Sequence, residues 1–343
     1  MKKKIRFGIV GTNFIVRWVL KGAREDARFE AVAICSRKQE TAQTFAEDQG
    51  IPYTFTDFEA MVSSDLIDAV YIASPNYCHV TYALAAMRQG KHVLCEKPLA
   101  SNAQEAKVMI AASEQYDVTL MEAMKLTLTP NFKQVMDQLA KVGTVRRYFS
   151  CYCQYSSRYD KLKEGVVLNA FKRELSTGAM MDIGIYTLYP LIVLFGKPDK
   201  IDASGYLLST GVDGQGAINF TYPTMNATLL YSKIADSNLP TEIQGESGLL
   251  RIDKIQTISD VRFYPRQEAA SGKGEKSKPE ILSQPLTHDE YYYEVAHFID
   301  LILAGKRESS INSHQNSLWT LEVIDEVRRQ IGVIYPADIH KMY

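Results

Sequence analysis

The sequence predicts an α/β protein, with a doubly wound parallel sheet at the N-terminus followed by an α+β domain with a mostly antiparallel sheet. Up to about residue 130, short apolar runs alternate with segments of helical spacing, which is typical of βαβ units. Beyond that point, apolar and polar residues alternate over long segments, which indicates antiparallel strands covered on one face. A chain of 343 residues favours two domains. We place the boundary near residue 124, which gives domains of residues 1–124 and 125–343.

Five strands joined by four helices are expected in the first domain. The predicted strands are Ile5–Val10, Phe29–Cys35, Ala69–Ala73, His92–Cys95 and Val118–Met121. The predicted helices between them are Ile15–Ala23, Lys38–Gln49, His79–Gln89 and Ala103–Tyr116. Right-handed crossovers bring the carboxyl ends of such strands to one edge of the sheet, and ligands bind just outside that edge.

The second domain is expected to begin with a helix, Asn131–Val142, and to continue with long strands. The predicted strands are Val145–Tyr155, Lys200–Leu208, Gly214–Tyr222 and Thr224–Lys233. The segment Gln267–Pro279, rich in Ser, Gly, Lys and Glu, is predicted to be a mobile loop. Two helices, Asp289–Ala304 and Ser313–Ile331, are expected to close the chain.

The composition excludes some classes of partner. The net charge is −1, from 39 basic and 40 acidic residues, which gives no electrostatic reason to expect nucleic acid or an anionic membrane. No segment approaches the roughly 20 apolar residues of a membrane span. The five cysteines contain no C-x-x-C pair, so we expect a cytoplasmic protein with free thiols and no metal site.

The turn after the first strand is the first candidate site. A dinucleotide-binding fingerprint would place glycines at positions 11, 13 and 16, and only Gly11 is present. Asparagine is the residue other than glycine that best tolerates a left-handed backbone, and the helix N-terminus offers N–H donors to a phosphate. The alternative is a tight turn without a ligand. The expected cofactor contacts are Gly11, Thr12, Asn13, Phe14 and Ile15.

The end of the second strand bears on the choice of cofactor. An enzyme that uses NAD is expected to have an acidic residue here that accepts from the ribose 2′-hydroxyl. This chain instead has the Ser36 hydroxyl and the Arg37 guanidinium, which can bind a 2′-phosphate bidentately, followed by Lys38. We therefore predict that NADP(H) is preferred, with NAD(H) as the alternative.

A third segment with turn chemistry, Ala73-Ser74-Pro75-Asn76, follows the next strand. Pro75 makes a sharp exit, and Asn76 is suited to cap the helix that follows. His79, in the first turn of that helix, is more typical of a structural hydrogen-bonding group than of a catalyst. We expect these residues to line the same cofactor-binding edge.

Glu96-Lys97-Pro98 ends the fourth predicted strand. Proline cannot donate to a ladder and makes the preceding residue extended, so Pro98 fixes the direction in which Lys97 leaves the strand. Alone, the tripeptide is either a solvated ion pair or an active-site lysine with a supporting glutamate. Because neighbouring strand ends carry turn chemistry, we interpret Glu96 and Lys97 as part of a cofactor cleft.

Together these motifs resemble the Gfo/Idh/MocA oxidoreductases. The matching features, in the family's order, are Gly11-Thr12, Ser74-Pro75-Asn76-x-x-His79, Glu96-Lys97-Pro98 and Asp182-x-Gly184-x-Tyr186. The resemblance covers essentially the whole chain. It implies a Rossmann domain, a C-terminal domain with a large open sheet, a small-molecule substrate, and a homodimer or dimer of dimers formed through that sheet.

Many members of the family carry histidine where this chain has Tyr186. Tyrosine at this position is similar to the branch of dimeric dihydrodiol dehydrogenase and NADP-dependent D-xylose dehydrogenase. The resemblance implies that Lys97 and Tyr186 are the catalytic pair and that Asp182 supports the site.

Electrostatics allows this chemistry. A tyrosine with an ordinary pKa of about 10 needs a reduction of roughly 2–3 units, or about 3–4 kcal/mol, to act as a base near neutrality. One ammonium at about 4 Å supplies on the order of 4 kcal/mol. We therefore expect Tyr186 to exchange the substrate proton while Lys97 lowers the Tyr186 pKa. Asp182, four residues earlier, would share the helix face of Tyr186 and orient Lys97 or a substrate hydroxyl.

Two departures from the family pattern leave alternatives open. Thr127 stands where an arginine is common, which bears on the substrate, and Asn13 replaces a cofactor glycine. The leading prediction is an NADP-dependent oxidoreductase acting on an aldose, a cyclic diol or a small dicarbonyl. An inositol or polyol dehydrogenase is the second prediction, and the missing histidine counts against it. The third is a non-catalytic NADP(H) sensor, which would have no chemical need for Lys97, Asp182 and Tyr186 together.

Overall fold

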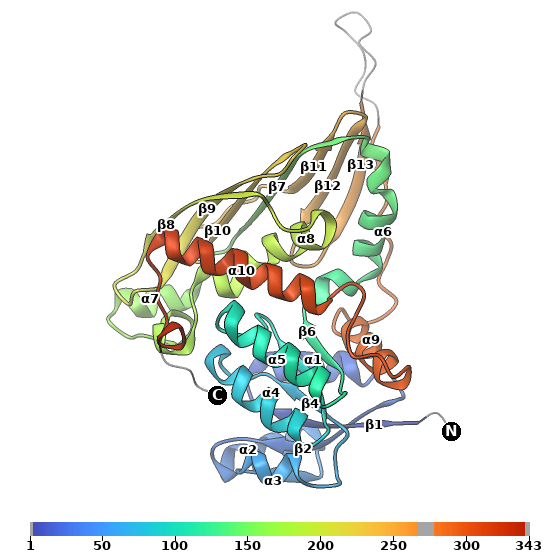
Figure 1. Cartoon of the computed structure of the whole chain (residues 1–343), viewed down its shortest axis with the longest axis vertical. Helices are drawn as coiled ribbons and strands as arrows, with labels where there is room; N and C mark the ends of the chain where they lie inside the picture. Colours follow the sequence, from blue (N-terminus) through green and yellow to red (C-terminus); the bar gives the residue numbers. More distant parts are fainter. Residues whose placement is uncertain (1–2, 267–277, 340–343) are drawn as a thin grey trace, which may run out of the picture. The chain divides into compact units, whose positions relative to one another are not determined.

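The computed structural model describes residues 3–266 and 278–339, so the predicted loop Gln267–Pro279 lies almost entirely outside the described residues. The chain divides into two compact units. The first consists of Met1–Leu128, Thr287–Leu321 and Pro336–Tyr343, and the second of Thr129–Leu286 and Glu322–Tyr335 (Figure 1). The division into compact units therefore differs from a single boundary at residue 124, because it assigns Thr287–Leu321 to the first unit. The functional division into residues 1–124 and 125–343 stays a prediction.

Among the described residues, the first unit contains a six-stranded sheet in the order β3-β2-β1-β4-β5-β6. The pairs are all parallel, which confirms the doubly wound sheet. β3 was not predicted, because a strand of three residues is too short to show periodicity. The strands are β1 (Ile5–Val10), β2 (Phe29–Cys35), β3 (Tyr53–Phe55), β4 (Ala69–Ile72), β5 (His92–Glu96) and β6 (Leu120–Ala123).

The helices of the first unit bury their apolar faces on this sheet. Phe7, Ile9, Tyr71 and Leu94 of the strands form one buried cluster with Val16, Leu20 and Phe298 of the helices. Gly50, at φ 63°, ends the second helix in the left-handed conformation that glycine adopts without strain. The helices are α1 (Phe14–Ala23), α2 (Gln39–Gln49), α3 (Phe58–Val62), α4 (His79–Arg88), α5 (Ala103–Gln115) and α9 (Tyr292–Leu303).

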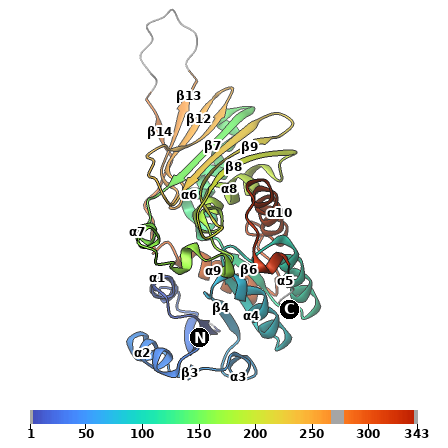
Figure 2. The ribbon, with the colours of Figure 1, turned by 90° about the vertical axis from the view of Figure 1, so that its left-hand side faces the viewer.

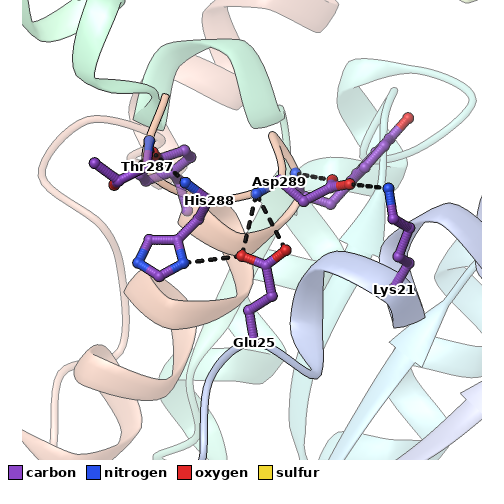
Figure 3. A network of polar contacts seen from close by, with 7 residues as sticks. Lys21, Glu25, Thr287, His288 and Asp289 are labelled. Atoms are coloured by element: carbon purple, nitrogen blue, oxygen red, sulfur yellow. Dashed lines mark hydrogen bonds and ion pairs between the residues drawn. The ribbon is translucent and has the colours of Figure 1, made fainter. Parts of the chain in front are cut away.

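The segment that leads into α9 is bound to the end of α1. The Glu25 carboxylate lies 2.8 Å from Nδ1 of His288 and accepts from the main-chain N–H of Asp289, while the Asp289 carboxylate pairs with Lys21 at 3.1 Å (Figure 3). A Cβ on Gly22 would lie 2.8 Å from the main-chain nitrogen of Tyr292, so a side chain there would separate the two helices. A helix distant in sequence thus completes the core of the first unit.

The second unit contains, in the described residues, an eight-stranded sheet in the order β14-β13-β12-β11-β7-β10-β9-β8. All its pairs are antiparallel except β7 with β10, which confirms the predicted mostly antiparallel sheet. Figure 2 shows these strands side by side. They are β7 (Val145–Cys153), β8 (Lys200–Leu207), β9 (Asp213–Thr221), β10 (Asn226–Ser232), β11 (Thr241–Gly245), β12 (Gly248–Lys254), β13 (Ser259–Pro265) and β14 (Glu280–Ile281).

One face of this sheet is covered by helix, as the alternation in the sequence predicts. Tyr148 of β7 is fully buried, and its hydroxyl donates to the Thr187 carbonyl of α8 (Ile185–Phe195) at 3.1 Å. Arg147 and Phe149, with the opposite parity in β7, line a hollow of about 450 Å³ on the other face. The remaining helices are α6 (Pro130–Gln138), α7 (Ser157–Lys163) and α10 (His314–Ile331), which begins in the first unit and ends in the second.

One helical stretch, Arg173–Phe195, is long and apolar enough to cross a membrane by length and composition, with a mean hydropathy of 1.6. However, 72% of its apolar window is buried inside the structure. Since a buried core helix passes the same test, the stretch is weak evidence for a membrane span.

Candidate active site

The residues predicted for the site form two clusters, one in each unit. The first surrounds the carboxyl ends of β1, β2, β4 and β5. The second lies at the start of α8.

The turn after β1 is held against the end of β4. Gly11 has φ 105°, and a Cβ there would lie 2.7 Å from the Ala73 carbonyl oxygen, so only glycine fits. The Asn13 amide nitrogen donates to the same carbonyl at 3.0 Å. The absence of a side chain at Gly11 thus lets the turn after β1 approach the end of β4 closely.

The conformation expected for Asn13 is wrong. Its backbone is extended, with φ −78° and ψ 175°, and its Oδ1 accepts from the main-chain N–H groups of Ile15 and Val16. Asn13 is therefore the N-cap of α1, and Gly11 alone takes the left-handed conformation. Two of the N–H groups expected for a phosphate thus bond to Asn13. Thr12, Phe14 and Ile15 flank this cap, and Phe14 is 50% exposed and contacts Trp18 edge to face.

Ser36, Arg37 and Lys38 follow β2 as predicted. The Ser36 N–H donates to the Phe55 carbonyl at the end of β3, which fixes the start of the turn. Arg37 and Lys38 are exposed. Burial raises the pKa of the Cys78 thiol, and the Tyr77 hydroxyl and the Arg37 charge oppose that rise. The guanidinium therefore acts electrostatically on the turn that follows β4.

The turn after β4 differs from the prediction at Asn76. Asn76–Cys78 forms a 3₁₀ turn, and Cys78 occupies the N-cap position of α4, so Asn76 does not cap that helix. The reason is local, because Pro75 directs the chain into a turn in which the Cys78 N–H donates to the Pro75 carbonyl at 2.9 Å. Asn76 remains partly exposed at the sheet edge.

His79 joins two of the strand ends. Its side chain is fully buried, with Nε2 3.0 Å from the Ser74 carbonyl oxygen and Nδ1 3.0 Å from that of Pro98. Burial lowers its pKa, although both carbonyls oppose this effect. The prediction of a structural hydrogen-bonding histidine agrees with this geometry. Any contribution to cofactor binding would act through the two turns.

Glu96 is not one half of a solvated ion pair. Its Oε1 accepts from the hydroxyl of the buried Tyr71 at 2.6 Å, and its Oε2 accepts from the main-chain N–H of Lys97 at 3.3 Å. Burial raises the pKa of the Glu96 carboxyl, and the charge of Lys97 opposes that rise. Lys97, partly exposed, follows at the cis Lys97–Pro98 bond.

Among the buried acids of the first unit, two that interact with the charge of Glu96 were missed by the sequence analysis. Glu122 of β6 accepts from the Leu99 N–H at 2.9 Å, and burial raises its pKa to about 7. Glu294 of α9 is 1% exposed, and burial together with the charge of Glu96 raises its pKa well above the ordinary value. The signal for both was an acidic residue inside an apolar run. Both carboxyls interact with the charge of Glu96, and burial favours the protonated form of each.

Thr127 is a structural residue. It is buried, and its hydroxyl lies 2.5 Å from Oδ1 of Asn312 and 2.8 Å from the Met124 carbonyl oxygen. The position that carries arginine in many relatives of this pattern therefore contributes to packing within the first unit here.

The second cluster rests on a distorted helix. Met180–Gly184 is π-helical and continues into α8, so the α-helical spacing assumed for Asp182 and Tyr186 holds only from Ile185 onward. π-Helical turns are rare and occur often at functional sites. The Met180 N–H donates to the buried Asp213 carboxylate at 2.7 Å, which anchors the first turn.

Asp182 and Tyr186 have partners that the sequence did not suggest. The Asp182 carboxylate pairs with the ammonium of Lys233, whose side chain is only 3% exposed. The Tyr186 ring packs edge to face on Tyr152, with 5.8 Å between the ring centroids. Lys233 was missed because a lysine at the end of a predicted strand is usually a solvated charge.

The first unit is a doubly wound sheet whose first turn requires glycine and whose second turn is basic. The second unit carries a tyrosine and a carboxylate. Together these features define the class of nicotinamide-dependent oxidoreductases. The chain belongs to the Gfo/Idh/MocA family. Residues 5–124 match the model of the oxidoreductase family with the NAD-binding Rossmann fold, and residues 135–251 match that of the family's C-terminal domain.

Relatives cover nearly the whole chain. The scyllo-inositol 2-dehydrogenase (NADP⁺) IolU of Bacillus subtilis is 46% identical over 334 residues, which are 97% of this chain and 99% of the relative. The uncharacterized oxidoreductase YgjR of Escherichia coli is 40% identical over 341 residues, or 98% and 100%. Trans-1,2-dihydrobenzene-1,2-diol dehydrogenase of Xenopus tropicalis is 29% identical over 320 residues, or 90% and 91%.

Solved structures share the fold. The aldose-aldose oxidoreductase of Caulobacter crescentus superposes with a TM-score of 0.82 at 22% identity, covering 96% of this chain and 97% of that one. The 3-ketoreductase KijD10 of Actinomadura kijaniata gives 0.79 at 23% identity, with coverage of 96% and 98%. The family, fold class and dehydrogenase or reductase class predicted from the sequence are thus confirmed. The roles of individual site residues stay predictions.

Proposed function

We propose that this protein is an NADP(H)-dependent dehydrogenase that transfers a hydride between the nicotinamide and a ring carbon bearing a hydroxyl group. The substrate class is a sugar, a cyclic diol or a cyclic polyol, and the polyol is the first to test. The observation that carries this choice is the 46% identity, over 97% of the chain, to an NADP⁺-dependent dehydrogenase of scyllo-inositol. We therefore give a cyclic polyol the same weight as a sugar or a cyclic diol as the substrate class, although Tyr186 replaces histidine.

In the oxidative direction, Tyr186 accepts the hydroxyl proton of the substrate while the carbon–hydrogen electron pair leaves as a hydride. NADP⁺ supplies the hydride acceptor when it is bound. Lys97 polarises the substrate oxygen and favours the ionised phenol through its positive charge.

The test is an absorbance assay of NADP⁺ reduction with scyllo-inositol, myo-inositol, D-xylose and a dihydrodiol. We expect Tyr186→Phe and Lys97→Met each to lower kcat by about 10²–10⁴-fold, because each removes a group that moves or stabilises charge in the transition state. Affinity for NADPH, measured in parallel, should remain within a few-fold for Tyr186→Phe. Near-wild-type turnover by both variants contradicts the assignment.

NADP(H) is proposed as the preferred cofactor because Arg37 and Ser36 replace the acidic residue that an NAD enzyme would use. Arg37→Ala should lower kcat/KM for NADP⁺ by about 10–100-fold, as expected for the loss of a charged hydrogen bond, and should leave NAD⁺ use little changed. Parallel titrations with both cofactors measure this. A wild-type preference for NAD⁺ contradicts the proposal.

A non-catalytic NADP(H) sensor is the second candidate, favoured by Asn13, whose cap occupies two N–H groups at the start of α1. Tight NADPH binding without turnover of any substrate in the panel would select it.

We also propose a cytoplasmic homodimer, or a dimer of dimers, formed through the sheet face that carries Arg147 and Phe149. The hollow lined by these residues on the second unit supports the choice of face. Light scattering after size exclusion tests the assembly, and a monomer at micromolar concentration contradicts it.

A further inference from the structure

Lys233 occupies an unusual position for a lysine. It directly follows β10, and its main chain is fixed on both sides: its N–H donates to the Gly214 carbonyl at 2.9 Å, and its carbonyl accepts from the Ser156 N–H at 2.9 Å. Its side chain is 3% exposed and lies with Nζ 5.7 Å from the ring centroid of Phe171. The ammonium therefore cannot move to solvent without disturbing the packing around it.

A buried ammonium needs a compensating charge, because desolvation of an unpaired ion costs several kcal/mol. The Asp182 carboxylate supplies it. The restraint is mutual, since a lysine fixed by its backbone and its packing also fixes the carboxylate that it pairs with.

Asp182 nevertheless remains reachable. Its side chain is 38% exposed, whereas that of Lys233 is 3% exposed. The carboxylate thus lies at the boundary between the buried lysine and the open side of the cluster. A carboxylate that is held by a buried cation and still exposed can accept a hydrogen bond from a ligand hydroxyl without first having to be ordered.

The backbone beneath Asp182 is equally constrained. Gly178 has φ 147°, and a Cβ there would lie 2.1 Å from Oδ1 of Asp213, so the chain enters the π-helical turn tightly against Asp213. Gly184, at the end of that turn, packs on Tyr231 of β10, where a Cβ would lie 3.1 Å from the ring. Lys233 follows the same strand two residues later. β10 therefore packs against the π-helical turn through Tyr231, and the residue that follows the strand is the cation, Lys233.

We propose that Lys233 is a positioning residue for substrate recognition: through its ion pair it holds the Asp182 carboxylate in the orientation that accepts from a second hydroxyl of a polyhydroxylated substrate, beside the one that reacts. This inference rests on the proposed function. It assigns recognition of neighbouring hydroxyls to the second unit, and it predicts that Lys233 acts on substrate binding rather than on cofactor binding.

The test compares wild type, Lys233→Met, Asp182→Asn and the double variant with scyllo-inositol and NADP⁺. Lys233→Met keeps the apolar stem and removes the charge. We expect its KM for scyllo-inositol to rise by about 10–100-fold, the worth of a charged hydrogen bond, with a much smaller change in kcat. NADPH affinity should stay within about twofold of wild type, because the expected cofactor contacts all lie in the first unit.

The double variant keeps the test decisive if Lys233→Met alone folds poorly. It removes both members of the pair, so no unpaired charge is left buried. Its KM should match that of Asp182→Asn, since Lys233 has no carboxylate left to position. A further rise of about tenfold on adding Lys233→Met to Asp182→Asn overturns the proposal.

A merely structural role gives a different result. It lowers the melting temperature and the active fraction, and thus kcat per enzyme, while KM stays unchanged. Lys197→Met is the matched control, because Lys197 forms an ion pair with Glu322 in the same unit but is 42% exposed, and its loss should leave KM unchanged. If wild type shows no turnover, the proposed function and this inference both fail. If wild type is active and Lys233→Met has the same KM, this inference alone fails.

Discussion

At the scale of single residues, Asn13 serves two neighbours with one side chain. Its Oδ1 caps α1 through Ile15 and Val16, and its Nδ2 holds the Ala73 carbonyl at the end of β4. Asn13→Ala removes all three bonds. We expect the free energy of unfolding to fall by about 1 kcal/mol, the usual cost of losing an N-cap. Urea denaturation measures it, and an unchanged midpoint and slope contradict the capping role.

Asn13→Asp separates capping from cofactor binding. Aspartate is an equally good N-cap acceptor but lacks the Nδ2 donor to the Ala73 carbonyl, so its stability should lie between those of Asn13→Ala and wild type. However, it adds a negative charge at the turn predicted to bind phosphate, so the Kd for NADPH should rise by about tenfold or more. Fluorescence titration can follow this, because Trp18 is 52% exposed on α1. Unchanged NADPH affinity would show that the phosphates bind elsewhere.

Residue identities at strand ends were predictable, and their conformations were not. Turn chemistry after three strands correctly located Gly11, Ser36 and Ser74 at one sheet edge. The extended conformation of Asn13 belongs to its local N-cap bonds with Ile15 and Val16, whereas its second partner, Ala73, lies 60 residues away. Likewise, Thr127 is bonded to Asn312, 185 residues away. A local pattern contains no information about such partners.

At the scale of elements, the π-helical turn Met180–Gly184 depends on how the chain enters it. Gly178→Ala combines backbone strain at φ 147° with a contact of 2.1 Å between the new Cβ and the Asp213 carboxylate. We expect unfolding to become easier by about 2 kcal/mol or more, and turnover to fall with it. NADPH binding to the first unit should persist.

Gly165→Ala is the matched control for that substitution. Gly165 has φ 85°, so alanine is strained there too, but nothing lies within 4 Å of the new Cβ. Its cost should be limited to about 1–2 kcal/mol from strain alone, with turnover retained. Equal effects of the two substitutions on stability and turnover would show that the Asp213 contact does not shape the site.

The π-helical turn could not be predicted, because its apolar spacing over five residues is that of an ordinary helix. The strands β11, β12 and β13 were also not predicted, whereas β7 to β10 were confirmed to within a few residues. Position in the sheet does not explain the difference, since β11, β12 and β13 lie inside it and β8 lies at its edge. Length does: β7, β8 and β9 have 8 or 9 residues, whereas β11, β12 and β13 have 5 to 7, so their alternation extends over fewer residues.

At the scale of the whole molecule, the first unit is completed by a helix from the end of the chain. Helical periodicity predicted α9, but a periodic apolar face does not specify what covers it. The contacts of Glu25 with His288 and Asp289 direct the segment to α1 (Figure 3). This assembly places Glu294 in the same interior as Glu96, which a single boundary at residue 124 could not anticipate.

Buried acids of the first unit make global stability depend on pH. The pKa of Glu122 is raised by burial from 4.5 to about 7. Between these values the folded protein binds more protons at this group than the unfolded chain does, so stability falls as the pH rises through the interval. A pKa shift of this size changes the free energy of unfolding by about 3 kcal/mol. His79, whose pKa is lowered by burial, acts in the opposite direction below pH 6.5.

Glu122→Gln isolates the contribution of this one acid, because glutamine resembles the protonated carboxyl and can still accept from the Leu99 N–H. At pH 4.5 we expect the variant and wild type to be equally stable. The variant should then become progressively more stable relative to wild type, by up to about 3 kcal/mol near pH 7.5, and the difference should level off above that. Urea denaturation at half-unit pH intervals measures it. Taking the difference between the two proteins removes the contribution of His79, which both retain. A difference that is constant from pH 4.5 to 7.5 would show that Glu122 ionises in the folded protein as it does in water.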